Sequence, residues 1–66
     1  MSVKPHTSMT APRFLTVDNV AMRLQVSGKT VRRWIASGAL PAYDLGGQYR
    51  ISEADLAAFM AARRSV

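Results

Sequence analysis

The sequence contains no cysteine, one histidine, and only four Asp and Glu residues against nine Lys and Arg. Without cysteine, neither a disulfide nor a thiolate metal site can stabilise the fold, and the composition is compatible with a reducing cytoplasm. Apolar runs are a few residues long, far short of the roughly 20 that span a membrane. The N-terminus also lacks the apolar block of a signal peptide. These absences predict a cytoplasmic protein without a metal centre.

The 66 residues are enough for one domain, with a core near the lower limit for independent folding. The formal net charge is +5 and the sequence pI is near 10.9. This balance favours a polyanionic partner, nucleic acid above all. Because small domains also carry excess charge for solubility alone, the positions of the basic residues have to decide.

Residues 1–13 show no apolar periodicity and include Lys4, Arg13 and two prolines. We interpret them as a flexible basic tail, followed by a folded domain over residues 14–64. The basic residues of the tail could touch DNA, although a solvated tail or an expression remnant is the simpler explanation.

Two short helices are predicted at the start of the domain. The first follows the N-cap residue Thr16 and runs to about Leu24; the second follows Ser27 and ends before Gly38, which is expected to be left-handed. Three or four residues between two short helices form the helix-turn-helix pattern. The apolar stripes are Val17, Val20, Ala21 and Leu24, and then Val31, Trp34 and Ile35, with Trp34 as the central core aromatic.

A β-hairpin and a third helix complete the domain. Gly46-Gly47 separates two short runs that contain Tyr, Leu and Ile, which predicts a hairpin with a primed turn. Ser52 caps the third helix, whose apolar stripe is Leu56, Phe59 and Met60. The predicted fold class is mainly α: a winged helix-turn-helix of three helices with a two-stranded hairpin wing between helices 2 and 3.

The second helix carries the basic residues that indicate the partner. Its apolar stripe leaves Lys29 and Arg33 on the opposite face, flanked by Arg32. The helix has no acidic residue, whereas the first and third helices do, so we favour contact with a DNA major groove over a merely solvated face. The DNA-binding candidates of this helix are Ser27, Gly28, Lys29, Thr30, Arg32 and Arg33.

The hairpin supplies a second basic element. Its tip would project as a wing, from which Gln48 and Arg50 can reach the DNA backbone or minor groove. Alternatively, the tyrosines only pack and the glycines only form the turn; Leu45 and Ile51 are assigned to the core. The wing candidates are Gly46, Gly47, Gln48, Tyr49 and Arg50, and minor candidates are Arg13 and Thr16.

No catalytic constellation competes with this interpretation. Gly28-Lys29-Thr30 matches the end of a phosphate-binding loop, but Arg23 stands where the upstream glycine belongs, and no strand precedes it. We expect no enzyme, no cofactor and no small-molecule effector.

Several segments occur in one combination: Leu15-Thr16-Val17, Val20-Ala21, Leu24, Val26-Ser27, Thr30 to Ile35, Ser37-Gly38, Leu40-Pro41-Ala42, Gly46-Gly47, Tyr49-Arg50-Ile51 and Asp55-Leu56. Over about residues 14–60, this combination resembles the excisionase-type DNA-binding domain of the MerR-like winged helix-turn-helix superfamily. The resemblance implies a recognition helix with Lys29, Arg32 and Arg33, and a wing whose Arg50 meets the DNA backbone.

Members of this family include phage and integrative-element excisionases, which direct an integrase toward excision, and small regulators of the BldC type, which bind direct repeats. Full-length MerR regulators continue into a dimerisation helix and an effector domain. Because this sequence ends soon after Met60, neither is expected.

The resulting hypothesis is a sequence-specific double-stranded DNA-binding protein, bacterial or phage-encoded and associated with the nucleoid. It would bind tandem sites cooperatively and head to tail, bend the DNA and assist an integrase in excision. The alternative is a small MerR-like transcriptional regulator that uses the same surface. A third possibility is an interaction module whose basic face docks on an acidic protein.

Overall fold

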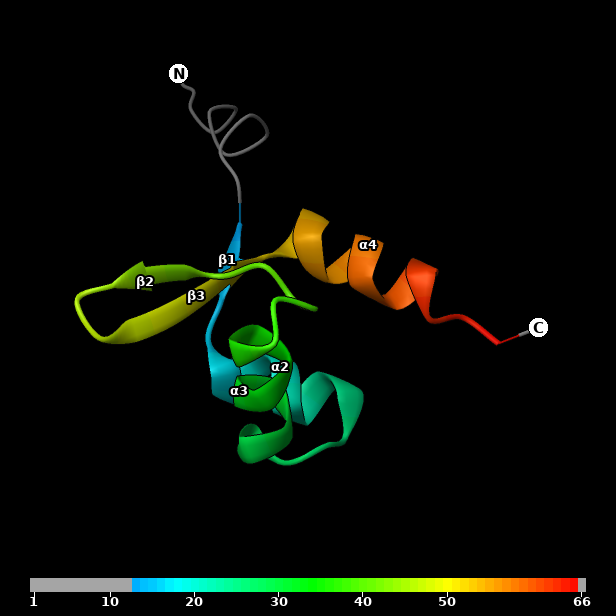
Figure 1. The fold of residues 1–66 in the computed structure, drawn as a ribbon, viewed down its shortest axis with the longest axis horizontal. Helices are drawn as coiled ribbons and strands as arrows, with labels where there is room; N and C mark the ends of the chain where they lie inside the picture. Colours follow the sequence, from blue (N-terminus) through cyan, green and yellow to red (C-terminus); the bar gives the residue numbers. More distant parts are fainter. Residues whose placement is uncertain (1–12, 66) are drawn as a thin grey trace, which may run out of the picture.

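The computed structural model describes residues 13–65. Three helices and three strands follow one another along this part of the chain (Figure 1): β1 Phe14–Leu15, α2 Val17–Leu24, α3 Gly28–Ala36, β2 Tyr43–Leu45, β3 Gln48–Ser52 and α4 Glu53–Ala62. This order confirms the predicted class, three helices with a hairpin between the second and third. The tail predicted over residues 1–13 lies outside the described residues except for Arg13.

The helix-turn-helix unit consists of α2, α3 and the residues between them. Thr16 caps α2 reciprocally: its hydroxyl accepts from the Asn19 backbone N–H at 3.0 Å, and Asn19 Oδ1 accepts from the Thr16 N–H at 3.1 Å. Ser27 caps α3 by accepting from the Thr30 N–H at 3.1 Å. Both predicted N-caps are therefore confirmed.

The sheet has three antiparallel strands in the order β1-β3-β2. Gly46 and Gly47 have φ angles of 67° and 88°, which confirms the primed turn between β2 and β3. The third strand, β1, was not predicted. It is only two residues long, and it pairs Leu15 with Ile51 beyond the base of the hairpin.

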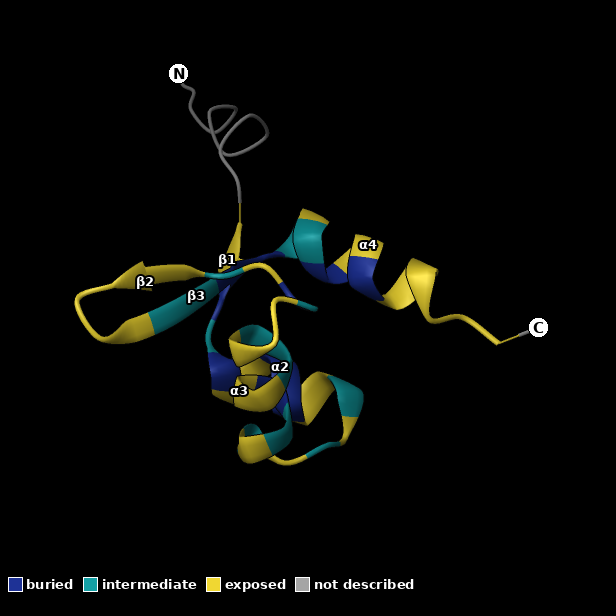
Figure 2. Ribbon diagram, viewed as in Figure 1, coloured by how far each residue is buried: buried dark blue, intermediate teal, exposed yellow. Residues whose placement is uncertain are grey.

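The core lies between the sheet and the helices, and Figure 2 shows its buried segments converging at the centre of the molecule. Every element except β2 contributes, together with the loop before it: Leu15, Val17, Val20, Ala21, Val31, Leu40, Ile51, Leu56 and Phe59. The largest fully enclosed side chains are all aliphatic: Leu40, Ile51, Val20 and Val31.

Trp34 lies at the margin of this core, so the prediction that it is the central core residue is wrong. It is half-buried, and its ring centroid lies 4.8 Å from that of Phe59. The Arg63 guanidinium covers the same Phe59 ring at 4.0 Å from its centroid. A core this small encloses aliphatic side chains completely but leaves part of the large Trp34 side chain exposed.

Two further core assignments are wrong. Leu45 is 58% exposed, because the register places it opposite Gln48 on the face of the sheet that points away from the helices. Met60 is 46% exposed, because α4 turns only Leu56 and Phe59 into the core. The assignment of Ile51 to the core is confirmed.

Candidate nucleic-acid interface

The exposed surface of α3 is basic. Lys29, Arg32 and Arg33 are all exposed, while Val31 on the opposite side is fully buried. The first turn of α3 contains no acidic residue, so the free backbone N–H groups at its start keep their positive potential. This surface has the charge and the convex shape that fit a major groove about 12 Å wide.

At the start of α3, the Ser27 and Thr30 hydroxyls also stabilise the helix. The Ser27 and Thr30 hydroxyls lie 3.0 Å apart, in addition to the capping bond from Ser27 to the Thr30 backbone. Each hydroxyl keeps a further hydrogen-bonding position, because a hydroxyl donates once and accepts twice.

Gly28 has a packing role that sequence reasoning missed. A Cβ at this position would lie 3.3 Å from an Arg32 guanidinium nitrogen and 3.7 Å from Val17 Cγ1. The guanidinium of Arg32 therefore occupies the space beside Gly28, at the junction of α3 with the start of α2. The sequence identified this glycine only as a DNA-binding candidate.

The wing is the hairpin of β2 and β3. Asp44 Oδ1 accepts from the Gly47 N–H at 3.0 Å, which holds the turn in shape from the side chain. Gly46, Gly47 and Gln48 at the tip are exposed, and Tyr49 is half-buried against the core. The tip thus offers backbone groups and the Gln48 side chain to a partner.

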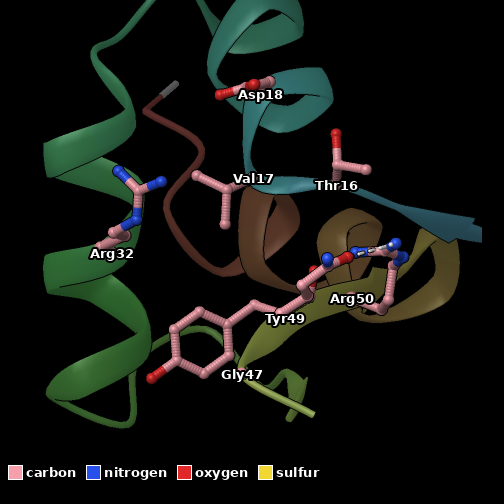
Figure 3. Close-up of a pocket in the computed structure, with 8 residues that line it drawn as sticks. Thr16, Val17, Asp18, Arg32, Gly47, Tyr49 and Arg50 are labelled. Atoms are coloured by element: carbon pink, nitrogen blue, oxygen red, sulfur yellow. Dashed lines mark hydrogen bonds between the residues drawn. The ribbon is translucent and has the colours of Figure 1, made fainter. Parts of the chain in front are cut away.

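Arg50 is bound back onto the wing. One guanidinium nitrogen donates to the Tyr49 carbonyl at 3.0 Å and the other to Gln48 Oε1 at 3.0 Å. Figure 3 shows the Tyr49 ring extending toward α3 and the Arg50 side chain on the other side of β3. Since a guanidinium has five N–H groups, Arg50 keeps donors for an anion while its position on the wing is fixed.

A cleft of about 360 Å³ lies where α2, α3 and the wing meet (Figure 3). Arg32 supplies a positive charge from α3 and Arg50 supplies one from the wing. The open edge of β3 and the capped start of α2 provide the remaining walls. The lining residues are Thr16, Val17, Asp18, Arg32, Gly47, Gln48, Tyr49 and Arg50.

The cleft brings together part of the predicted set. Thr16, Arg32 and the wing residues from Gly47 to Arg50 meet there, while Lys29 and Arg33 lie elsewhere on the exposed surface of α3. Sequence reasoning missed Val17 and Asp18 as cleft residues. Their positions directly after the cap residue Thr16 were the available signal, because a helix start next to basic residues is a common anion site.

Arg13, the last predicted site residue, is exposed and lies beside the sheet. Its carbonyl accepts from the Glu53 N–H at 2.9 Å, which ties the residue before β1 to the start of α4. It does not line the cleft.

Within residues 13–65, no helix combines the length and the apolarity that a membrane crossing requires. The same part of the chain contains no group of three or more His, Cys, Asp or Glu side chains placed to hold a metal ion.

A family model described as a helix-turn-helix domain matches residues 14–64. No curated protein sequence matches the chain. The matched segment contains both helices of the helix-turn-helix unit, the wing and α4. The exposed basic residues of α3 thus lie on the second helix of that unit, the one that enters the major groove in DNA-binding helix-turn-helix domains. The chain therefore belongs to the helix-turn-helix domain family, a family of DNA-binding domains.

Proposed function

We propose that this protein is an excision factor: it binds specific double-stranded DNA at tandem sites, bends it and assists an integrase in excision. The observation that carries the DNA-binding part is the exposed surface of α3, whose charged residues are all basic and whose Arg32 lines a cleft together with Arg50. The excision role rests on the resemblance to excisionase-type domains.

In this proposal, α3 specifies the sequence and the wing holds the backbone. Lys29 and Arg33, one helical turn apart, reach base edges, where Arg and Lys recognise guanine. The cleft receives the sugar–phosphate strand between Arg32 and Arg50. The hydroxyls of Ser27, Thr16 and Thr30, and the backbone at Gly28, Gly46 and Gly47, add phosphate contacts that position the protein without selecting sequence.

Tandem binding follows from the size of the module. A single DNA-binding module of this kind buries about 600–1,000 Å² of protein surface, which is a small basis for selecting one site in a genome. Several copies on adjacent direct repeats would multiply the selectivity. Successive helices and wings acting on one side of the duplex would also bend it.

The test compares two arginine variants on a one-site duplex selected from a random pool and on random duplex. Arg33→Ala should weaken binding to the selected site by about 1–3 kcal/mol and relax preference at one base step. Arg50→Ala should weaken binding to both duplexes alike and give a shallower dependence on salt.

Arg64→Ala is the matched control, since it removes one positive charge from exposed chain after α4 and leaves the cleft unchanged. If Arg33→Ala and Arg50→Ala reduced the ratio of specific to random binding equally, the division between helix and wing would be wrong. If the wild-type protein bound no duplex at moderate salt, the interaction module for an acidic protein would replace the proposal.

The small transcriptional regulator uses the same residues, so DNA binding alone does not separate it from an excision factor. An integrative-element excision assay with and without the protein does: excision that increases when the protein is added supports the proposal. Unchanged excision together with repression or activation of a promoter reporter favours the regulator.

A further inference from the structure

The sheet has an apolar outer face that no helix covers within residues 13–65. Directly paired residues share a face of a sheet and successive residues alternate. Since Leu15 and Ile51 face the core, Phe14, Tyr43 and Leu45 face away from it. Their exposed fractions are 44%, 52% and 58%. The Phe14 and Tyr43 rings meet edge to face with centroids 5.4 Å apart, so the three side chains form one continuous surface, the outer-face patch.

Helix α4 has a second uncovered apolar surface. Its sequence from Leu56 to Ala62 contains no polar side chain, and only Leu56 and Phe59 are buried. A helix that is apolar on all sides is ordinarily enclosed. Here Ala57, Met60 and Ala61 share one exposed side at helical spacing; we name them the α4 patch.

The two patches belong to parts of the molecule that extend in opposite directions. Figure 1 shows the hairpin and α4 leaving the centre of the fold on opposite sides, and Figure 2 shows exposed surface on both. Copies bound in one orientation on direct repeats would turn unlike ends toward each other, so a contact between them must be heterologous. Two different patches at two opposite ends meet that requirement.

We propose that the α4 patch of one copy packs on the outer-face patch of the next copy. This inference rests on the tandem binding of the proposed function and names the surface that would make it cooperative. Alanines allow the α4 backbone to approach closely, while Tyr43 and Leu45 supply the bulk that fills the contact.

Charges at one end of the contact are complementary. Glu53 lies one helical turn before Ala57 on the side of the α4 patch, with its carboxylate 3.6 Å from the Arg23 guanidinium. Arg50 is the cross-strand partner of Tyr43 and therefore lies on the outer face of the sheet. With the start of α4 near Tyr43, Glu53 of one copy meets Arg50 of the next.

The contact is small, and it does not need to hold two free copies together. Copies on adjacent repeats are kept at a high effective concentration by the DNA, so a weak contact is enough to make binding cooperative.

The experiment measures the affinity of each variant for a one-site duplex and a two-site direct-repeat duplex, both built from the site selected for the wild-type protein. Leu45→Gln alters the outer-face patch and Met60→Gln alters the α4 patch. Met22→Gln is the matched control, because Met22 is 76% exposed on α2 and belongs to neither patch. None of these substitutions changes the charge.

Leu45→Gln and Met60→Gln should each keep one-site affinity within about twofold and reduce the cooperativity factor to about one, whereas Met22→Gln keeps it. An equimolar mixture of the two patch variants should regain cooperativity. In one order on the duplex, the intact α4 patch of the Leu45→Gln copy meets the intact outer-face patch of the Met60→Gln copy.

Cooperativity that persists in both single variants, or that the mixture fails to regain, would overturn the contact while leaving the proposed function intact. Equal per-site affinity of the wild-type protein on both duplexes would overturn tandem cooperativity in the proposed function and the contact with it. Absence of wild-type binding to either duplex would overturn the DNA-binding function.

Discussion

Asp18 is the acidic residue of a cleft that otherwise offers two arginines to an anion. Its position in the first turn of α2 stabilises the helix, typically by about 0.3–1 kcal/mol at such a site. The same carboxylate repels a phosphate that enters the cleft. Asp18 therefore favours the folded state of α2 and opposes binding of the DNA backbone.

We predict that Asp18→Asn raises DNA affinity by about two- to fivefold on both selected and random duplex, because one charge near a phosphate contributes ~1 kcal/mol or less in a solvated cleft. The gain should shrink as salt rises. Titration at two salt concentrations measures it. Asp55→Asn, the same charge change on α4 away from the cleft, is the control; equal gains in both variants would assign the effect to net charge alone.

At the residue scale, the sequence predicted which side chains are basic and exposed, but not how they are held. The spacing along the helix predicted that the basic residues lie away from the buried Val31. The structure confirms this for Lys29, Arg32 and Arg33, which are all exposed. Gly28 of α3 also lies beside Val17 of α2, since a Cβ at Gly28 would be 3.7 Å from Val17 Cγ1. Such a contact between helices leaves no local pattern in the sequence.

The turn between α2 and α3 sets the geometry of the recognition unit. Gln25 occupies the left-handed region with φ 58° and ψ 46°. Its N–H bonds back to Ala21 and Met22, and the Val26 N–H reaches the Ala21 carbonyl at 2.9 Å. The left-handed conformation usually falls to glycine because a Cβ is crowded there.

We predict that Gln25→Gly raises the free energy of unfolding by about 0.5–1 kcal/mol, since it relieves this crowding at an exposed position. Gly38→Ala provides the opposite test at the end of α3, where φ is 83°; it should lower stability by about 1 kcal/mol. Urea denaturation followed by Trp34 fluorescence measures both. Lower stability of Gln25→Gly would show that the glutamine side chain stabilises the turn.

At the element scale, the features predicted correctly were those that depend on residues close together in the sequence. The caps Thr16, Ser27 and Ser52 act within three residues and were found from sequence. The strand β1 depends on pairing with β3, far along the chain, so its two residues carry no detectable period. Leu45 was misassigned for a related reason, because a shift of one residue in the register exchanges the core face and the outer face.

At the scale of the whole molecule, the hairpin serves two contacts. Its strand β3 supplies Gln48 and Arg50 to the cleft, and the same residues are the cross-strand partners of Leu45 and Tyr43 in the outer-face patch. The α4 patch and the exposed basic residues of α3 lie on different helices. DNA and the neighbouring copy would therefore contact the hairpin side by side.

The small size of the two patches predicts the state of the free protein. Stable interfaces bury about 800 Å² per partner and involve about 20–30 residues on each side. Each patch here consists of three side chains, and α4 has 10 residues, a length of about 15 Å. A symmetric dimer would have to use one patch against itself, so its interface would be equally small.

We predict that the protein sediments as a monomer at about 0.1 mM without DNA, well below the ~1 mM dissociation constant expected for so small a contact. With a two-site duplex, the complex should contain two copies at saturation, and the second copy should bind more tightly than the first. A tight dimer at micromolar concentration without DNA would contradict a contact that depends on the duplex, because the repeats would then recruit a preformed symmetric pair.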